Sequence, residues 1–148
     1  MHKLITKLYF SLLVLLSPAL FANPATIIDV LDAQVRQPMV GRTVTAGYFT
    51  LQNKSADDLS LVSVSSDAFE RIELHQHSHR NGVMRMEQVD AITVEAASSV
   101  TLKPGGLHLM LFEPKTDLVI GEVIILTLTF SNQQEFDIEV PIVALPKR

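Results

Sequence analysis

The sequence contains no cysteine and no tryptophan, and its basic residues are outnumbered by acidic ones. Without cysteine the chain cannot form a disulfide bond, a thiolate metal site or a thiol nucleophile, and we expect no lipid anchor on cysteine. Its 12 lysines and arginines against 16 aspartates and glutamates give a net charge of −4 at pH 7. Nucleic acids and anionic membrane surfaces need a basic face, so we expect neither as a partner.

Long hydrophobic runs are also scarce. The one at residues 8–21 is shorter than the ~18 to 20 residues that a membrane-spanning helix needs, which disfavours a membrane anchor. It follows Lys3 and Lys7 in the pattern of a secretory signal peptide. We therefore expect residues 1–22 to be cleaved and residues 23–148 to form one periplasmic domain without a membrane span.

No stretch of the remaining chain has a sustained helical period. Short apolar or alternating runs separated by turn residues predict an all-β domain instead. Asn81-Gly82 is the strongest hairpin signal, and only residues 30–34 are ambiguous between helix and strand. About seven to nine short strands in one domain predict a Greek-key sandwich or barrel. The predicted strands span residues 27–35, 43–51, 59–64, 69–75, 83–89, 99–102, 107–112, 123–130 and 135–143.

Side chains that offer nitrogen or thioether sulfur to a metal are concentrated in one region. Four of the five histidines and three of the five methionines lie between residues 75 and 110, namely His75, His77, His79, His108, Met84, Met86 and Met110. Thioether sulfur is soft and favours Cu(I), whereas zinc favours cysteine or more histidine and calcium favours carboxylates. Blue-copper electron transfer needs a thiolate, so the region predicts a copper site of another kind.

Strand geometry allows four of these ligands to meet. His108 and Met110 are two residues apart on one strand and share a face. The Asn81-Gly82 hairpin brings Met86 beside the strand that ends near His75. The turn after Pro104 would deliver His108 and Met110 from across the sandwich. Such a set of neutral ligands leaves the copper charge uncompensated, which suits binding and release more than redox turnover.

The other candidates have weaker roles. We consider His77 equally compatible with an auxiliary ligand and an ordinary strand residue, and His79 more compatible with a hydrogen-bonded residue. These two histidines are also candidates for a weaker accessory Cu(II) site. Met84 fits a gap-filling core residue, and Glu73 and Glu87 fit solvated carboxylates better than partners that orient imidazole rings. We assign no role to Met39 in the loop that follows Pro38.

The spacing His75-x10-Met86-x21-His108-x-Met110 resembles the signature of the PCu(A)C-type periplasmic copper chaperones, and the segment GYFTLQN at residues 47–53 is similar to that family too. The resemblance implies a cupredoxin-like β-barrel that binds Cu(I) through these four residues. It also implies a metallochaperone that supplies the dinuclear copper centre of cytochrome c oxidase, with the oxidase subunit II or a Sco-type thiol protein as acceptor. We expect a monomer without enzymatic activity.

Three other functions remain open from the sequence. One is a secreted, metal-free β-sandwich that binds a protein or peptide at a sheet edge. Another is copper storage or resistance, which needs the same ligands as delivery. A copper enzyme fits least, because no acid/base pair, nucleophile or cofactor-binding loop accompanies the ligands.

Overall fold

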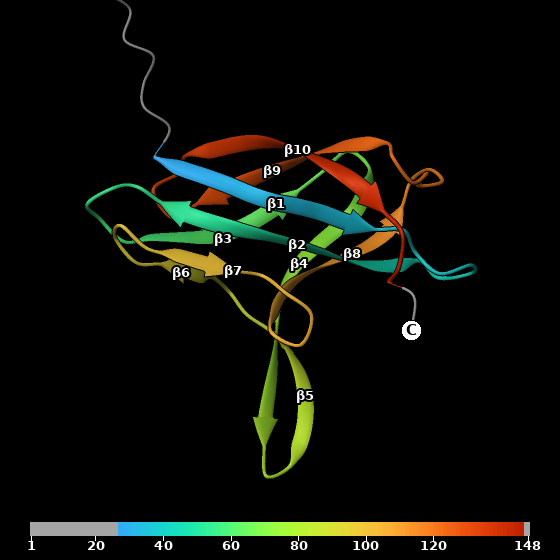
Figure 1. Cartoon of the computed structure of the whole chain (residues 1–148), viewed down its shortest axis with the longest axis horizontal. Helices are drawn as coiled ribbons and strands as arrows, with labels where there is room; N and C mark the ends of the chain where they lie inside the picture. The colour runs from blue at the N-terminus through green and yellow to red at the C-terminus, as the bar shows by residue number, and fades with distance from the viewer. Residues whose placement is uncertain (1–26, 147–148) are drawn as a thin grey trace, which may run out of the picture.

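The computed structural model describes residues 27–146, which form ten β-strands (Figure 1). The all-β prediction is confirmed. The predicted signal peptide, residues 1–22, lies outside the described residues. Among residues 27–146, no helix has the length and apolar character needed to span a membrane. The strands are β1 (Ile28–Arg36), β2 (Val44–Asn53), β3 (Leu59–Ser65), β4 (Phe69–Arg80), β5 (Val83–Gln88), β6 (Ile92–Val94), β7 (Ser99–Thr101), β8 (Leu107–Pro114), β9 (Val123–Phe130) and β10 (Glu135–Val143).

The strands form two sheets that pack as a sandwich. One sheet has the order β5-β4-β8-β2-β1, with β7 also paired to β2, and the other has the order β10-β9-β3-β6. A short parallel pairing of β1 with β10 joins the two sheets at one side. The other pairings are antiparallel, as expected for a sandwich built from hairpins and longer crossovers.

The core lies between the two sheets. Leu51 and Leu109 of one sheet and Leu128 and Phe130 of the other are at most 1% exposed and belong to one continuous apolar cluster. Burying a side chain of this size stabilises the fold by roughly 1.5–3 kcal/mol. The sandwich is therefore held by the inward faces of its strands, and the outward faces are free to carry other chemistry.

Strand positions agree with the sequence prediction, but some strand ends do not. The short β6 was not predicted, and the strand count of seven to nine was therefore too low. The strand predicted to end at His75 continues to Arg80. Residues 30–34 are strand with a bulge, where Asp32 has φ 53° and the register to β2 shifts between Leu31 and Gln34.

The extension of β4 produces the most prominent feature of the molecule. Pairing of β4 with β8 ends at Gln76, so beyond this point β4 pairs only with β5. Figure 1 shows the resulting β4–β5 hairpin projecting from the sandwich. The predicted turn at Asn81-Gly82 is confirmed, and both residues have the positive φ values, 53° and 76°, that a tight hairpin turn of this kind requires.

Candidate metal centre

The candidate ligands lie on the outward face of the sheet that contains β4 and β8. Leu109 and Leu111 of β8 are completely buried in the core, so alternation points His108 and Met110 to the other side. On β4, Leu74 is buried opposite Leu109, and His75 is opposite His108. Alternation along each strand therefore places the core on one side of the sheet and the candidate ligands on the other.

His75 and His108 are neighbours in the same sheet. Their ring centroids are 5.9 Å apart, with the ring planes inclined by 39°. The prediction that His108 and Met110 reach the site from across the sandwich was wrong, because β4 and β8 pair directly. The two histidines therefore need no contact between sheets to approach each other.

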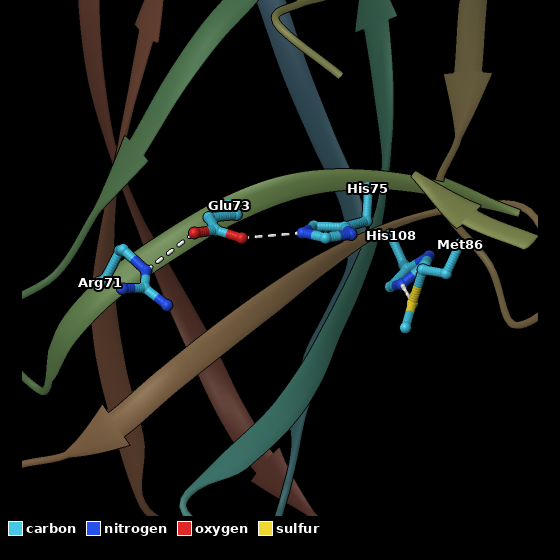
Figure 2. Close-up of polar contacts among 5 residues, drawn as sticks. All are labelled: Arg71, Glu73, His75, Met86 and His108. Atoms are coloured by element: carbon cyan, nitrogen blue, oxygen red, sulfur yellow. Dashed lines mark hydrogen bonds and ion pairs between the residues drawn. The ribbon is translucent and has the colours of Figure 1, made fainter. Parts of the chain in front are cut away.

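Met86 completes the approach from the hairpin. It lies opposite His77 on β4, and its sulfur is 3.3 Å from Nε2 of His108 (Figure 2). The ring centroid of His77 is 4.9 Å from that of His108, closer than the ring of His75. Two imidazoles and one thioether from three strands therefore lie together.

Met110 borders the same space. A hollow of about 270 Å³ has His77, Met86, His108 and Met110 in its lining. Its other lining includes Met39, from the loop between β1 and β2. His75 is not among the residues that line this hollow, and its ring centroid is 5.9 Å from that of His108. The structure thus brings three of the four predicted ligands around one opening, with the fourth adjacent to His108.

The ring of His108 has a defined orientation. Its Nδ1 donates to the carbonyl oxygen of Gly106 at 3.0 Å, because a carbonyl can only accept. In the neutral ring Nε2 then carries a lone pair, and this lone pair faces the lone pairs of the Met86 sulfur. Two electron-pair donors directed at each other form a suitable arrangement for a soft cation.

Burial keeps His108 in the form that can bind metal. His108 is 5% exposed, and this desolvation lowers its pKa from the usual 6.5. The hydrogen bond to Gly106 opposes the shift, whereas the charges of His77 and His75 add to it. The imidazole therefore remains neutral at a lower pH than an exposed histidine would.

His75 is oriented by a carboxylate. Its Nε2 lies 2.9 Å from Oε2 of Glu73, and the other oxygen of Glu73 accepts from Nε of Arg71 at 2.8 Å (Figure 2). Nδ1 of His75 is buried and has no hydrogen-bond partner among the described residues. Because the carboxylate holds Nε2, Nδ1 is the atom that His75 can offer to a metal. The interpretation of Glu73 as a solvated carboxylate was therefore wrong.

The ligand types restrict the metals that fit. Residues 27–146 contain no group of three or more histidine, aspartate or glutamate side chains arranged to hold an ion. Hard cations such as Ca²⁺ and Mg²⁺ need several oxygen ligands, and structural zinc sites usually have four nitrogen or sulfur ligands including cysteine. Methionine sulfur beside imidazole nitrogen favours a soft monovalent ion.

Comparison with known proteins agrees with this fold. The family described as "Putative lipoprotein LpqE-like" matches residues 28–142. The chain belongs to the LpqE-like family. Two relatives are the uncharacterized protein RP573 of Rickettsia prowazekii, 37% identical over 92 residues, and a putative lipoprotein of Leifsonia xyli, 30% identical over 103 residues. These matches cover 62% and 69% of this chain but only 51% and 62% of the relatives.

Solved structures similar to this LpqE-like protein are PCuAC domains with the cupredoxin-like fold. The copper-bound PCuAC domain from PmoF2 is 25% identical, with a TM-score of 0.68 over 80% of this chain and 94% of that domain. The solution structure of CuI-DR1885 from Deinococcus radiodurans is 26% identical, with a TM-score of 0.64 over 85% of this chain and 83% of that protein. The predicted cupredoxin-like fold is confirmed, and the ligand spacing itself stays a prediction.

Several site features of the LpqE-like protein were not found from the sequence. Met39 lines the hollow although its loop position gave no spacing signal. Tyr48 and Arg36 also line it, with the guanidinium carbon 4.8 Å from the centre of the tyrosine ring. Their period-two positions on β1 and β2 place them on the outward face, but only the strand order shows that this face adjoins His108.

One hairpin residue differs from expectation in another way. Met84 is 57% exposed, so its interpretation as a core gap-filler was wrong. His79 is exposed as well, and it lies directly opposite Met84 near the tip of the hairpin. Glu87 lies opposite Gln76 on the other face of the hairpin, away from the imidazoles.

Proposed function

We propose that this LpqE-like protein is an extracytoplasmic Cu(I) carrier that binds one ion through His75, Met86, His108 and Met110. The observation that carries the proposal is the 3.3 Å approach of the His108 Nε2 lone pair to the Met86 sulfur beside an open hollow. The two lone pairs are close enough for one soft cation to accept both of them.

The similar structures support copper as the metal. One is described as a copper-bound PCuAC domain and another as the Cu(I) form of DR1885. The putative-lipoprotein description of the family and of the Leifsonia relative supports a location outside the cytoplasm, in agreement with the predicted signal peptide. We infer that the periplasm is the compartment.

Release to another protein is compatible with the site. Met86 is 49% exposed, so an incoming ligand can reach the metal from the side of the hollow. The ligands are neutral, and exchange for the thiolates or imidazoles of an acceptor requires no change in oxidation state. We propose the dinuclear copper centre of cytochrome c oxidase, reached directly or through a Sco-type thiol protein, as the destination.

Titration with Cu(I) under reducing conditions tests this function. The protein without residues 1–22 should bind Cu(I), and the Met86→Ala/Met110→Ala variant should lose this binding. A Val62→Ala/Ile125→Ala variant is a suitable control, because these exposed residues lie on the other sheet. Binding that is unchanged in the methionine variant would refute the proposed site.

Delivery and storage differ in what happens next. A carrier should pass Cu(I) to an oxidase subunit II domain or to a Sco-type protein when the two are mixed, and copper should then elute with the acceptor. A storage protein should retain the metal. Retention by the LpqE-like protein in the presence of both acceptors would exclude the delivery role while leaving copper binding intact.

A further inference from the structure

The β4–β5 hairpin separates its side chains by chemistry. One face carries the directly opposed pairs His79–Met84 and His77–Met86, so every position in these two pairs offers nitrogen or sulfur. The other face carries the pairs Arg80–Val83, Ser78–Arg85 and Gln76–Glu87, with no imidazole or thioether. Alternation along two strands thus places the metal-binding side chains of the hairpin in one line.

Core packing does not account for this line. Every residue of β5 is exposed, and Met84 and Met86 are 57% and 49% exposed. Beyond Gln76 the hairpin pairs with no other strand and projects from the sandwich (Figure 1). Methionines at these positions gain little from burial, so their side chains are available for a ligand.

The line leads into the main site, which is the Cu(I) site proposed above. Met86 contacts His108 through its sulfur, and the ring of His77 lies 4.9 Å from the ring of His108. Nδ1 of His77 is buried without a hydrogen-bond partner among the described residues. An unpartnered ring nitrogen on this face is a polar group that a metal would satisfy.

We propose that His79 and Met84 form a second, weaker Cu(I) site, and that copper passes between it and the main site through His77 and Met86. This inference rests on the proposed function. Opposed side chains on antiparallel strands have Cβ atoms about 4.5–5.5 Å apart, so an imidazole and a thioether can hold one ion between them. The next pair is two residues along, roughly 7 Å away.

The transfer is an exchange of ligands. A bond from the ion to His79 or Met84 breaks as one to His77 or Met86 forms, and the ion remains Cu(I) with no electron or proton transferred. The outer pair supplies only two ligands in an exposed position, so it binds less tightly than the main site. It therefore fills last, and it is the first to be reached by an acceptor protein.

Methionine methyl signals test the second site in the unaltered protein. We would label the methionine methyl groups with ¹³C and add Cu(I) alone under reducing conditions. The Met86 and Met110 signals should shift with the first equivalent, and the Met84 signal with the second. If Met86 and Met110 shift but Met84 does not, the second site is refuted and the proposed function stands. If none of the three shifts, both are refuted.

A pair of matched variants tests the path. The His79→Ala/Met84→Ala variant should lose the second equivalent and transfer copper to a thiol acceptor more slowly. The Ser78→Ala/Arg85→Gln variant alters a directly opposed pair on the other face of the same hairpin, and it should keep both properties. Equal transfer rates in the two variants would overturn the relay, and equal stoichiometry would overturn the site.

Discussion

The Nε2 atom of His108 lies 3.3 Å from the sulfur of Met86, although the two residues are on strands β8 and β5, which are separated in the sheet by β4. The contact exists because Met86 leans across the outward face of β4 toward the neighbouring strand. The site therefore depends on both strand pairings of β4. It also depends on the sulfur of Met86. A leucine could fill the same space but would have no sulfur to offer to a metal.

Replacing Met86 with leucine should separate these contributions. The substitution keeps the size of the side chain but removes the sulfur, so the fold should be retained. We expect the affinity for Cu(I) to fall by at least about tenfold, which corresponds to roughly 1.4 kcal/mol of binding free energy. Competition with a Cu(I) chelator measures the change. An unaltered affinity would mean that the sulfur is not a ligand.

Glu73 provides a test of how His75 is oriented. The Glu73→Gln variant retains the shape but loses the charge that pairs with Arg71 and holds the His75 ring. Loss of such an orienting group typically lowers metal affinity about 10- to 100-fold, and we expect the lower part of this range. The distribution of His75 between its two neutral tautomers, followed by ¹⁵N NMR, should change as well.

Glu87→Gln is the matched control for that experiment. Glu87 is exposed and lies on the opposite face of the hairpin, so the substitution should change neither the affinity nor the His75 tautomer. If both variants lost affinity equally, the effect would reflect net charge and not the contact with His75.

The lowered pKa of His108 predicts how stability depends on pH. In the unfolded chain this histidine binds a proton near its usual pKa of 6.5, whereas burial lowers the pKa in the folded state. The unfolded state therefore binds more protons between these two values, and stability falls as the pH is lowered through this window. Above pH 6.5 the contribution of His108 is fully present.

Denaturant unfolding of the copper-free protein at several pH values measures this effect. The His108→Gln variant should show a smaller loss of stability between pH 6.5 and the folded pKa. An NMR titration of His108 gives the folded value directly, and a pKa at or above 6.5 would contradict the prediction.

Copper should stabilise the folded protein. A ligand that binds only the folded state raises the thermal midpoint, and at a free concentration of about 100 times Kd it adds roughly 2.7 kcal/mol. A metal-free interaction module would show no such increase. Thermal unfolding with and without Cu(I) under reducing conditions therefore distinguishes the two functions.

Asn53 should matter for stability and not for copper. Its buried side chain donates to carbonyl oxygens of Asp57 and Val94 at 2.8 and 3.1 Å and accepts from the Ser55 amide at 2.9 Å. Asn53→Ala leaves these groups unsatisfied, so we expect a loss of about 2 kcal/mol in unfolding free energy. Urea unfolding measures it, and Gln52→Ala at the exposed neighbouring position should change stability little.

The strand pattern and the hairpin turn were predictable from local sequence. Alternation in Leu107 to Leu111 indicates which side chains face the core, and Asn81-Gly82 fixes the turn. The pairing of β4 with β8 is a contact between distant parts of the chain, and no local pattern specifies it. For this reason the ligands could be proposed, but the placement of His75 beside His108 in one sheet could not.

Three features of the site could not be predicted from the sequence, for similar physical reasons. The end of β4 was placed too early because residues 77–80 contain none of the valine, isoleucine, threonine, phenylalanine, tyrosine or tryptophan typical of strands. The role of Glu73 depends on the ring orientation of His75, which spacing alone does not determine. Met39 reaches the hollow from a loop whose path is set by the surrounding strands.

Because β8 directs Leu109 and Leu111 inward and His108 and Met110 outward, the outward side chains of this strand can be changed without rebuilding the interior. Exchanging the outward residues for carboxylates or additional imidazoles would leave every buried leucine of that strand in place. The scaffold is therefore suited to engineering, in which a series of sites for different ions could be compared on one unchanged framework.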